Sequence, residues 1–343
     1  MSSTPARAAI MAFQPAWMET SSIAYVYGDE RIARMAAMTS LHPVQLTAEN
    51  FEAELPHLGQ VEVLFATWGM PKLTEAQLDR LPNLKVVFYA AGSVNAFAGP
   101  LVARGIAVCS AVEANAIPVA EFCLAQILLS CKNYFANTRL CRQGPWKDKI
   151  NGGRGVYGET VALLGIGAIS RHLLTLLKPI NLRVVAVSNY LASRPVDEVK
   201  TMGIDQLVSL EEAFREGYII SNHLPDKPSN QYVIRAEHFA SMRQNAVFIN
   251  TGRGAQVHEE GLIEVFSRRT DLTALLDVQY PEPPRAESPL YRLPNVQLSA
   301  HIAGSAGDEV RRMADFMIED FARWQAGKTL QHQVDPKELA TRA

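Results

Sequence analysis

Short segments that are apolar at almost every position alternate with helical patterns through the second half of this chain. Six of them are rich in Val, Ile and Leu, at residues 160–165, 183–188, 217–221, 246–250, 272–278 and 295–299. Such segments are typical of strands buried on both faces of a parallel sheet. Helical patterns stand between them, with a capping box at Ser209 to Glu212 and an apolar stripe along 259–269. This alternation predicts a doubly wound α/β domain.

The first part of the chain repeats the alternation more loosely, with strands expected at 24–27, 61–66, 85–90 and 106–109. Residues 116–135 are predicted to form a helix that is apolar on most sides, and 308–325 the last strong helix. A length of 343 residues suits two domains. We therefore expect two doubly wound, Rossmann-like parallel-sheet domains with a cleft between them. The substrate domain would combine 1–114 with 306–343, and the dinucleotide-binding domain would cover 115–305.

Composition excludes several classes of protein. Hydrophobic residues make up 48% and the net charge is −2, which indicates a globular chain without bulk attraction to nucleic acid or an anionic membrane. The longest charge-free window, 86–103, contains Gly, Asn and Pro residues that would break a helix in lipid. Gln14 and Pro15 interrupt the only apolar stretch near the N-terminus, so no signal peptide is expected.

The cysteines and histidines give no sign of a disulfide framework or a metal site. Four cysteines form no CxxC pair, which favours reduced thiols in a cytoplasmic protein. Eight histidines include no HExxH or Cys/His cluster, so we expect no metal. The absence of a Gly-x-Ser-x-Gly elbow argues against a serine hydrolase.

Two glycine motifs have different expected roles. Residues 153–158 match GxGxxG but precede a strand, whereas a pyrophosphate site needs a strand before the motif and a helix after it. We expect only a turn there. Residues 165–170 have the required context, with Gly165 for the tight turn, Gly167 for close backbone approach to phosphates, and Ser170 where a third Gly is usual. The alternative is a packed turn without a ligand, but the series of strands and helices favours a dinucleotide site.

The sequence leaves the choice between NAD and NADP open. NAD-binding units usually carry an acidic residue after the second strand to bind the ribose, whereas this strand ends in Ser188, Asn189 and Tyr190. No carboxylate there repels a 2′-phosphate, and Arg194 is a candidate to bind one. Alternatively, Asn189 hydrogen-bonds the plain ribose and Arg194 is simply solvated.

Arg253, Glu282 and His301 each follow a predicted strand, so they can converge at the carboxyl edge of the sheet, where α/β domains bind ligands. Each also has a purely structural alternative. Arg253 could stabilise a turn, Glu282 could be an exposed loop carboxylate, and His301 could cap the helix that follows. Together they suit reduction of a 2-oxo acid: Arg253 would bind its carboxylate, and His301 would exchange the hydroxyl proton. A hydrogen bond from the imidazole to Glu282 would orient the ring and favour its charged form.

The chain resembles the D-isomer-specific 2-hydroxyacid dehydrogenases over roughly residues 81–304. Residues 90–95 resemble the loop whose amides hold the substrate carboxylate, with Ala90 where the family has Gly, and 223–225 resemble the loop along the cofactor. Asn115 and 119–121 resemble the entry to the interdomain helix. The resemblance implies a substrate site at Ala91, Gly92, Ser93 and Arg253, and a catalytic set of Arg253, Glu282 and His301. It implies cofactor contacts at Gly165, Gly167, Ala168, Ile169, Ser188, Asn189, His223, Pro225, Thr251 and Asp277.

The same resemblance implies an oxidoreductase that transfers hydride between NAD or NADP and a small D-2-hydroxy or 2-oxo acid, of the glyoxylate, hydroxypyruvate or phosphoglycerate type. The alternative is a dinucleotide-sensing protein of the corepressor type with little catalysis. Family members are commonly homodimers with the helix after Asn115 at the interface, so we expect a homodimer. Trp68 lies where members line the substrate mouth, and the alternative for it is an ordinary packed residue.

Overall fold

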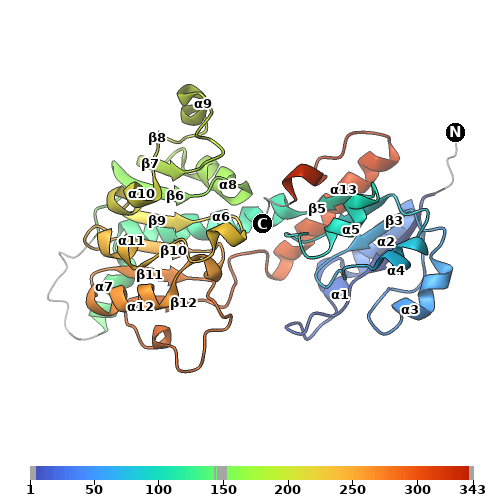
Figure 1. The fold of residues 1–343 in the computed structure, drawn as a ribbon, viewed down its shortest axis with the longest axis horizontal. Coiled ribbons are helices and arrows are strands. Elements are labelled where there is room, and N and C mark those ends of the chain that lie inside the picture. The colour runs from blue at the N-terminus through green and yellow to red at the C-terminus, as the bar shows by residue number, and fades with distance from the viewer. Residues whose placement is uncertain (1–4, 143, 145–152, 340–343) are drawn as a thin grey trace. The chain divides into compact units, whose positions relative to one another are not determined.

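Two parallel sheets organise the chain, one of five strands and one of seven (Figure 1). The computed structural model describes residues 5–142, 144 and 153–339. The first sheet belongs to a unit made of Met1–Asn115 and Ser305–Ala343, and the second to a unit made of Ala116–Gly304. The prediction of two Rossmann-like α/β sheets is therefore confirmed.

The first unit has its strands in the order β2-β1-β3-β4-β5, all parallel. They are β1 (Arg7–Met11), β2 (Ser40–Leu41), β3 (Val63–Ala66), β4 (Val86–Tyr89) and β5 (Ala107–Ser110). The helices are α1 (Ser22–Val26), α2 (Gly28–Met38), α3 (Phe51–Glu54), α4 (Glu75–Asp79), α5 (Ala98–Ala103) and α13 (Val310–Gln325).

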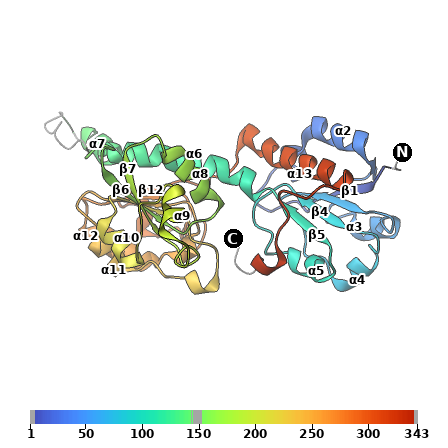
Figure 2. The same ribbon diagram turned by 90° about the horizontal axis from the view of Figure 1, so that it is seen from above.

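The strands of this unit are apolar throughout because both faces of the sheet are covered. Ala9 and Met11 of β1 pack under α3 to α5, whereas Ala8 and Ile10 pack under α1, α2 and α13. Figure 2 shows α2 and α13 on one side of the sheet and α4 and α5 on the other. Phe321 of α13 is fully buried, and burying such a ring contributes about 1.5–3 kcal/mol. The C-terminal helix is thus part of the first unit's core.

The second unit has the strand order β12-β11-β10-β9-β6-β7-β8, again all parallel. The strands are β6 (Glu159–Leu164), β7 (Leu182–Val187), β8 (Gln206–Leu207), β9 (Ile219–Asn222), β10 (Val247–Asn250), β11 (Thr273–Leu276) and β12 (Val296–Leu298). The helices are α7 (Tyr134–Cys141), α8 (Ala168–Leu177), α9 (Val196–Thr201), α10 (Leu210–Glu216), α11 (Ala236–Ser241) and α12 (Glu259–Arg268), with α6 (Val112–Cys131) entering from the first unit.

The strand order reverses between β6 and β9, which are neighbours in the second sheet. The chain leaves β6 into α8, on the side of the sheet that also carries α6, and α10 and α11 cover the other side (Figure 2). At such a switch point the connecting segments diverge and leave a crevice beyond the carboxyl ends of the strands. The second unit therefore has a ready position for a ligand at this edge.

The long apolar helix begins and ends four residues earlier than the predicted 116–135. It ends early because the chain turns at Asn133, whose φ of 51° is left-handed. A separate helix, α7, begins at Tyr134. Within the described residues, α6 is the one helix long and apolar enough to span a membrane. Half of its most apolar window is buried inside the protein, and core helices pass the same test.

Several local predictions differ from the structure. The strand expected at 24–27 is wrong, because Ser21 caps a helical turn there, and the first strand is instead β1. Helix α8 begins at Ala168, inside the second glycine motif rather than after it. The capping box of Ser209 and Glu212 is confirmed. Residues 156–158 form a bend and turn ahead of β6, as expected for the misplaced glycine motif, and the four cysteines are free.

Candidate active site

The turn from β6 to α8 depends on Gly165. Its φ is +88°, and a Cβ atom there would lie 2.6 Å from the carbonyl oxygen of His223, so only Gly fits. The buried Ser170 hydroxyl donates to the carbonyl of Gly165 at 2.7 Å. The serine that departs from the glycine fingerprint therefore ties the first turn of the helix back to the strand end.

The start of α8 suits a phosphate. The N-cap residue Gly167 makes no side-chain cap, and the first turn holds no acidic residue. A Cβ added to Gly167 would meet nothing within 4 Å, so its backbone is open to close approach. Backbone N–H groups at a helix start carry partial positive charge and bind anions. Gly167, Ala168 and Ile169 can therefore hold a pyrophosphate, and the residues present fit a dinucleotide.

His223 follows β9 beside this turn and is kept neutral. Burial lowers its pKa to about 4. Its Nε2 lies 2.8 Å from the Ser221 hydroxyl, while no described residue hydrogen-bonds the buried Nδ1. An unpartnered buried nitrogen beside the open turn is a polar group that a bound cofactor could satisfy.

The segment after β7 holds the candidates for ribose recognition. The Ser188 hydroxyl accepts from the backbone N–H of Leu191 at 3.3 Å. Arg194 donates to the Tyr190 hydroxyl at 2.9 Å, forms an ion pair with Glu198 at 3.2 Å and lies over the Tyr190 ring. Arg194 is therefore held near the end of β7. The two residues directly after β7, Ser188 and Asn189, are uncharged.

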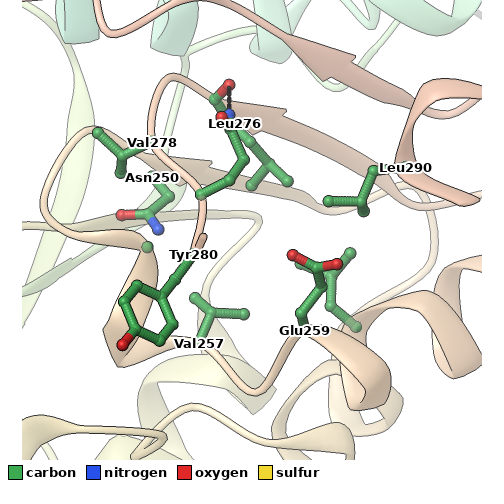
Figure 3. Close-up of a pocket in the computed structure, with 10 residues that line it drawn as sticks. Asn250, Val257, Glu259, Leu276, Val278, Tyr280 and Leu290 are labelled. Atoms are coloured by element: carbon green, nitrogen blue, oxygen red, sulfur yellow. Dashed lines mark hydrogen bonds between the residues drawn. The ribbon is translucent and has the colours of Figure 1, made fainter. Parts of the chain in front are cut away.

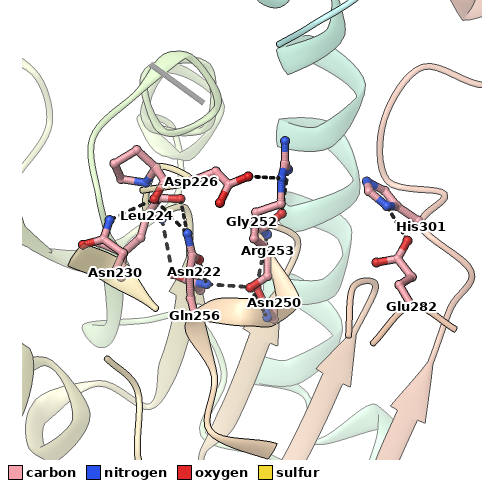
Figure 4. Close-up of polar contacts among 11 residues, drawn as sticks. Asn222, Leu224, Asp226, Asn230, Asn250, Gly252, Arg253, Gln256, Glu282 and His301 are labelled. Atoms are coloured by element: carbon pink, nitrogen blue, oxygen red, sulfur yellow. Dashed lines mark hydrogen bonds and ion pairs between the residues drawn. The ribbon is translucent and has the colours of Figure 1, made fainter. Parts of the chain in front are cut away.

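A buried network of three amides joins the ends of β9 and β10 (Figure 4). Asn222 donates from Nδ2 to Asn250 Oδ1 at 2.9 Å and to Gln256 Oε1 at 2.6 Å. Gln256 in turn donates to the carbonyls of Leu224 and Pro225, at 2.8 and 3.0 Å. The network fixes residues 223–225 against the segment that carries Arg253.

Arg253 lies at the end of this network and is partly exposed. Asn250 Nδ2 donates to its carbonyl at 3.3 Å, and Asn250 Oδ1 accepts from the Gly252 N–H at 3.1 Å. The guanidinium donates to the Gly252 carbonyl at 2.8 Å, and its Nε lies 3.5 Å from the carboxylate of Asp226. The Arg253 side chain is 38% exposed, so a ligand can reach the cation.

The segments that follow β11 and β12 bring Glu282 and His301 together. Gly254 packs directly on Gln279, because a Cβ at Gly254 would lie 2.0 Å from the Gln279 carbonyl carbon. This contact joins the Arg253 segment to the segment leading to Glu282. Nδ1 of His301 lies 2.7 Å from Glu282 Oε1, and both side chains are partly exposed (Figure 4). Arg253, Glu282 and His301 thus share the carboxyl edge of strands β10 to β12.

Asp277 holds the segment that carries His301. Its buried carboxylate accepts from the Ser299 hydroxyl at 2.6 Å and from the N–H groups of Ile302 and Ala303, each at 2.9 Å. The Asp277 carbonyl accepts from the His301 N–H, also at 2.9 Å. His301 has a φ of 54°, a left-handed conformation that costs a non-Gly residue about 1–2 kcal/mol. The hydrogen bonds that Asp277 accepts therefore hold the segment in which His301 adopts that conformation.

The predicted carboxylate loop lies in the first unit, after β4. The carbonyl of Ala90 accepts from the Thr67 hydroxyl at 2.9 Å, and the carbonyls of Ala91 and Gly92 accept from Ser110. No described residue accepts a hydrogen bond from the backbone N–H groups of Gly92 and Ser93. The loop is held by its carbonyls, which leaves these amides available to a carboxylate.

A small cavity behind the Arg253 segment is not a substrate site. It measures about 20 Å³, enough for one water molecule (Figure 3). Burial raises the pKa of Glu259, which faces this space, and a hydrogen bond from Ser288 at 3.3 Å opposes that rise. The lining is otherwise mainly apolar, with Val257, Leu262, Leu276, Val278 and Leu290.

Sequence reasoning missed four residues of this edge: Asn222, Asp226, Gln256 and Ser299. An Asn next to His223 and an Asp directly after Pro225 are signals, but their partners lie far along the chain. Thr251, a predicted cofactor contact, is buried with its hydroxyl 3.3 Å from Cys123 Sγ. The described residues contain no group of three or more His, Cys, Asp or Glu that could hold a metal ion.

Comparison with known proteins gives one family match. The profile of the D-isomer specific 2-hydroxyacid dehydrogenase NAD binding domain matches residues 124–303. D-3-phosphoglycerate dehydrogenase of Methanocaldococcus jannaschii is 27% identical over 270 residues, 78% of this chain and 50% of that protein. Hydroxypyruvate reductase of Thermotoga maritima is 27% identical over 282 residues, 80% of this chain and 89% of that protein. The chain thus spans half the length of the first relative and most of the second.

Solved structures agree on the fold. A phosphoglycerate oxidoreductase from Rhizobium etli superposes with a TM-score of 0.77 at 23% identity, covering 96% of this chain and 98% of that one. D-mandelate dehydrogenase of Rhodotorula graminis superposes with a TM-score of 0.76 at 20% identity over the same shares of the two chains. At these identities the likeness describes the fold.

Proposed function

This chain belongs to the D-isomer-specific 2-hydroxyacid dehydrogenase family, and we propose that it transfers hydride between NAD(P) and a small D-2-hydroxy acid or its 2-oxo acid. Acids of the glyoxylate, hydroxypyruvate and phosphoglycerate type are the first candidates, because the related proteins carry those names. The observation that carries the proposal is the 2.7 Å contact between His301 and Glu282, at the same sheet edge as Arg253.

Each residue of that set has a distinct task. Arg253 binds the substrate carboxylate in a charge-assisted, bidentate pair. Because Glu282 holds Nδ1, Nε2 of His301 remains to donate a proton to the carbonyl oxygen as the carbonyl carbon is reduced, and to accept it in the reverse direction. Glu282 also fixes the orientation of the imidazole ring through this contact. The dinucleotide, when bound, supplies or accepts the hydride.

The cofactor would lie along the residues that the second unit presents. Gly165, Gly167, Ala168 and Ile169 would hold the pyrophosphate, and the His223 to Pro225 segment would lie beside it. Ser188 and Asn189 present hydroxyl and amide groups to the ribose, and Arg194 supplies a cation. We expect both NADH and NADPH to bind, since Ser188 and Asn189 stand where NAD-binding units usually carry an acidic residue and Arg194 is a nearby cation. A preference above about tenfold for either, in paired affinity measurements, would contradict this.

The central experiment is a panel of 2-oxo acids crossed with both reduced cofactors, followed by absorbance of the reduced nicotinamide. His301→Ala should lower kcat by at least about 100-fold and leave dinucleotide affinity nearly unchanged, because only the proton donor is lost. Arg253→Ala should chiefly raise KM for the 2-oxo acid. Wild-type turnover by the His301 variant, with chemistry rate-limiting, would refute the mechanism. Dinucleotide binding without turnover of any acid would favour the sensor alternative.

A homodimer and a cytoplasmic location complete the proposal. Leu129 of α6 and Tyr134 and Leu140 of α7 are large apolar residues left exposed, which supports an interface between two copies at these helices. Sedimentation of the wild type and of Leu129→Glu would test it, with a monomeric variant expected. The free thiols support a reducing compartment.

A further inference from the structure

A chain of buried polar side chains links the ends of β9 and β10 to helix α6. Side chains alternate between the two faces of a strand, so Ser221 and His223 lie on the same face of the sheet. Thr251 lies on that face too, because Ser221 pairs with Ile249, two residues before it. Helix α6 meets this face at Cys123, whose Sγ lies 3.3 Å from the Thr251 hydroxyl oxygen.

Cys123 is the centre of the chain. Its thiol hydrogen-bonds the hydroxyl of Ser221 as well as that of Thr251. The Ser221 hydroxyl in turn lies 2.8 Å from Nε2 of His223. All four residues are buried, and a buried polar network whose members satisfy one another holds them in one geometry. Cys123 therefore connects two predicted cofactor contacts, Thr251 and His223, that follow different strands.

The chain has two consistent arrangements of its protons. Burial raises the pKa of the Cys123 thiol to about 12, so the sulfur keeps its proton at neutral pH and donates it to one of the two hydroxyls. Donation from Thr251 towards His223 makes Nε2 an acceptor and leaves the ring proton on Nδ1. Donation in the opposite direction leaves Nδ1 with a lone pair.

The surroundings of His223 distinguish the two arrangements. No described residue hydrogen-bonds its Nδ1, and its backbone packs against the turn at Gly165. That turn leads into a helix start that suits phosphate oxygens, which only accept hydrogen bonds. A proton on Nδ1 therefore suits a bound dinucleotide, whereas a lone pair there would repel its phosphate oxygens.

We propose that Cys123 is a positioning residue for the dinucleotide: through Ser221 it holds His223 with the ring proton on Nδ1, ready to donate to an oxygen of the bound cofactor. The inference rests on the proposed function, in which NAD(P) lies beside the His223 to Pro225 segment. Without the sulfur, the Ser221 hydroxyl is free to reverse its hydrogen bond. Part of the population would then carry the ring proton on Nε2.

The first test measures NADH affinity by fluorescence titration without any 2-oxo acid. Cys123→Ala should raise the Kd about three- to tenfold, since the apparent Kd rises in inverse proportion to the fraction of molecules that are competent to bind. Cys123→Ser, which restores a donor, should stay within about twofold of the wild type. Ser221→Ala should weaken binding at least as much as Cys123→Ala, and the double variant no further than Ser221→Ala, because both residues act through His223.

The second test reads the tautomer in the cofactor-free protein. Nitrogen NMR of histidine-labelled protein distinguishes the two ring nitrogens, and the His223 signals are identified by their loss in His223→Gln. The wild type should carry the proton on Nδ1, and Cys123→Ala should show a mixture of both tautomers.

Cys131→Ala is the matched control. Cys131 is a second buried cysteine about two turns further along α6, and it packs in the same hydrophobic core as Cys123. Its variant should lower stability in urea as Cys123→Ala does, because each removes a buried sulfur. It should leave the Kd for NADH and the tautomer of His223 unchanged.

Three results would overturn the inference and leave the proposed function standing. They are a proton on Nε2 of His223 in the cofactor-free wild type, wild-type NADH affinity in folded Cys123→Ala, and an equal rise in Kd in Cys131→Ala, which would assign the effect to core packing. Failure of the wild type to bind either NADH or NADPH would overturn both the inference and the proposed function.

Discussion

Asp277→Asn separates two possible tasks for a buried carboxylate. Asp277 accepts three hydrogen bonds from the segment 299–303, with Ser299 and Ile302 on one oxygen and Ala303 on the other. Asn has a single acceptor oxygen, so its amide group would face at least one buried N–H. A hydrogen bond to a charged group contributes about 1.5–3 kcal/mol, and an unsatisfied buried N–H costs about 1–3 kcal/mol. Removal of the buried charge offsets part of these losses. We therefore expect the free energy of unfolding of the variant to be about 2 kcal/mol below that of the wild type.

The functional consequence should appear in kcat. Without the carboxylate, the left-handed conformation of His301 loses its support, and a misplaced proton donor slows the chemistry by about 10- to 100-fold. Urea unfolding of the cofactor-free protein, NADH titration and steady-state kinetics measure the three quantities. The affinity for NADH should stay within about threefold of the wild type. Ser299→Ala, which removes one donor and leaves both N–H bonds intact, should cost less than about 1 kcal/mol.

The opposite pattern would refute this reasoning. If Asp277 served mainly to contact the nicotinamide, Asp277→Asn would weaken NADH binding and leave the stability of the cofactor-free protein unchanged. Wild-type stability and kcat together would show that the segment 299–303 holds His301 without the carboxylate.

Three further predictions concern the same edge of the second sheet. Burial lowers the pKa of His223 from 6.5 to about 4, so on acidification the unfolded state binds the proton first. The wild type should therefore lose about 3 kcal/mol of unfolding free energy between pH 6.5 and 4, measured by urea titration. His223→Gln should not show this loss. Gly165→Ala should raise the Kd for NADH at least about tenfold in fluorescence titration, because its Cβ would overlap the carbonyl of His223. Asp226→Asn should lower KM for the 2-oxo acid about two- to fivefold at constant kcat, since the carboxylate competes with substrate for Arg253; an unchanged KM at low salt would contradict this.

The strands of the second sheet could be predicted because each is buried on both faces, so nearly every residue is apolar. The predicted 160–165 and β6 differ by one residue at each end. The first unit was harder, since Tyr25 and Val26 look like strand residues, but Ser21 caps a helix there. Strand β2 has only two residues, too few for any periodic signal. The hydrophobic pattern therefore predicted the strands that are buried on both faces. It did not predict structure at a helix cap or at an edge strand.

For the candidate site, residue type and position after a strand were enough to bring Arg253, Glu282 and His301 to one sheet edge. The partners that hold them were not predictable in the same way. Asp226 and Arg253 are separated by 27 positions and meet because β9 and β10 are neighbours. The left-handed backbone of His301 also has no signal in a single sequence, because it follows from the hydrogen bonds that Asp277 accepts.

The first unit is built from two segments that are far apart in the sequence, and this affects the order in which the two units can fold during synthesis. The second unit is continuous in sequence, so its core can close once residue 304 has left the ribosome. The first unit, although most of it is made first, lacks Met317 and Phe321 of α13 until these later residues have also emerged. Nascent-chain truncations should therefore show protease resistance arising in the second unit before the first, the reverse of the usual order from the N-terminus.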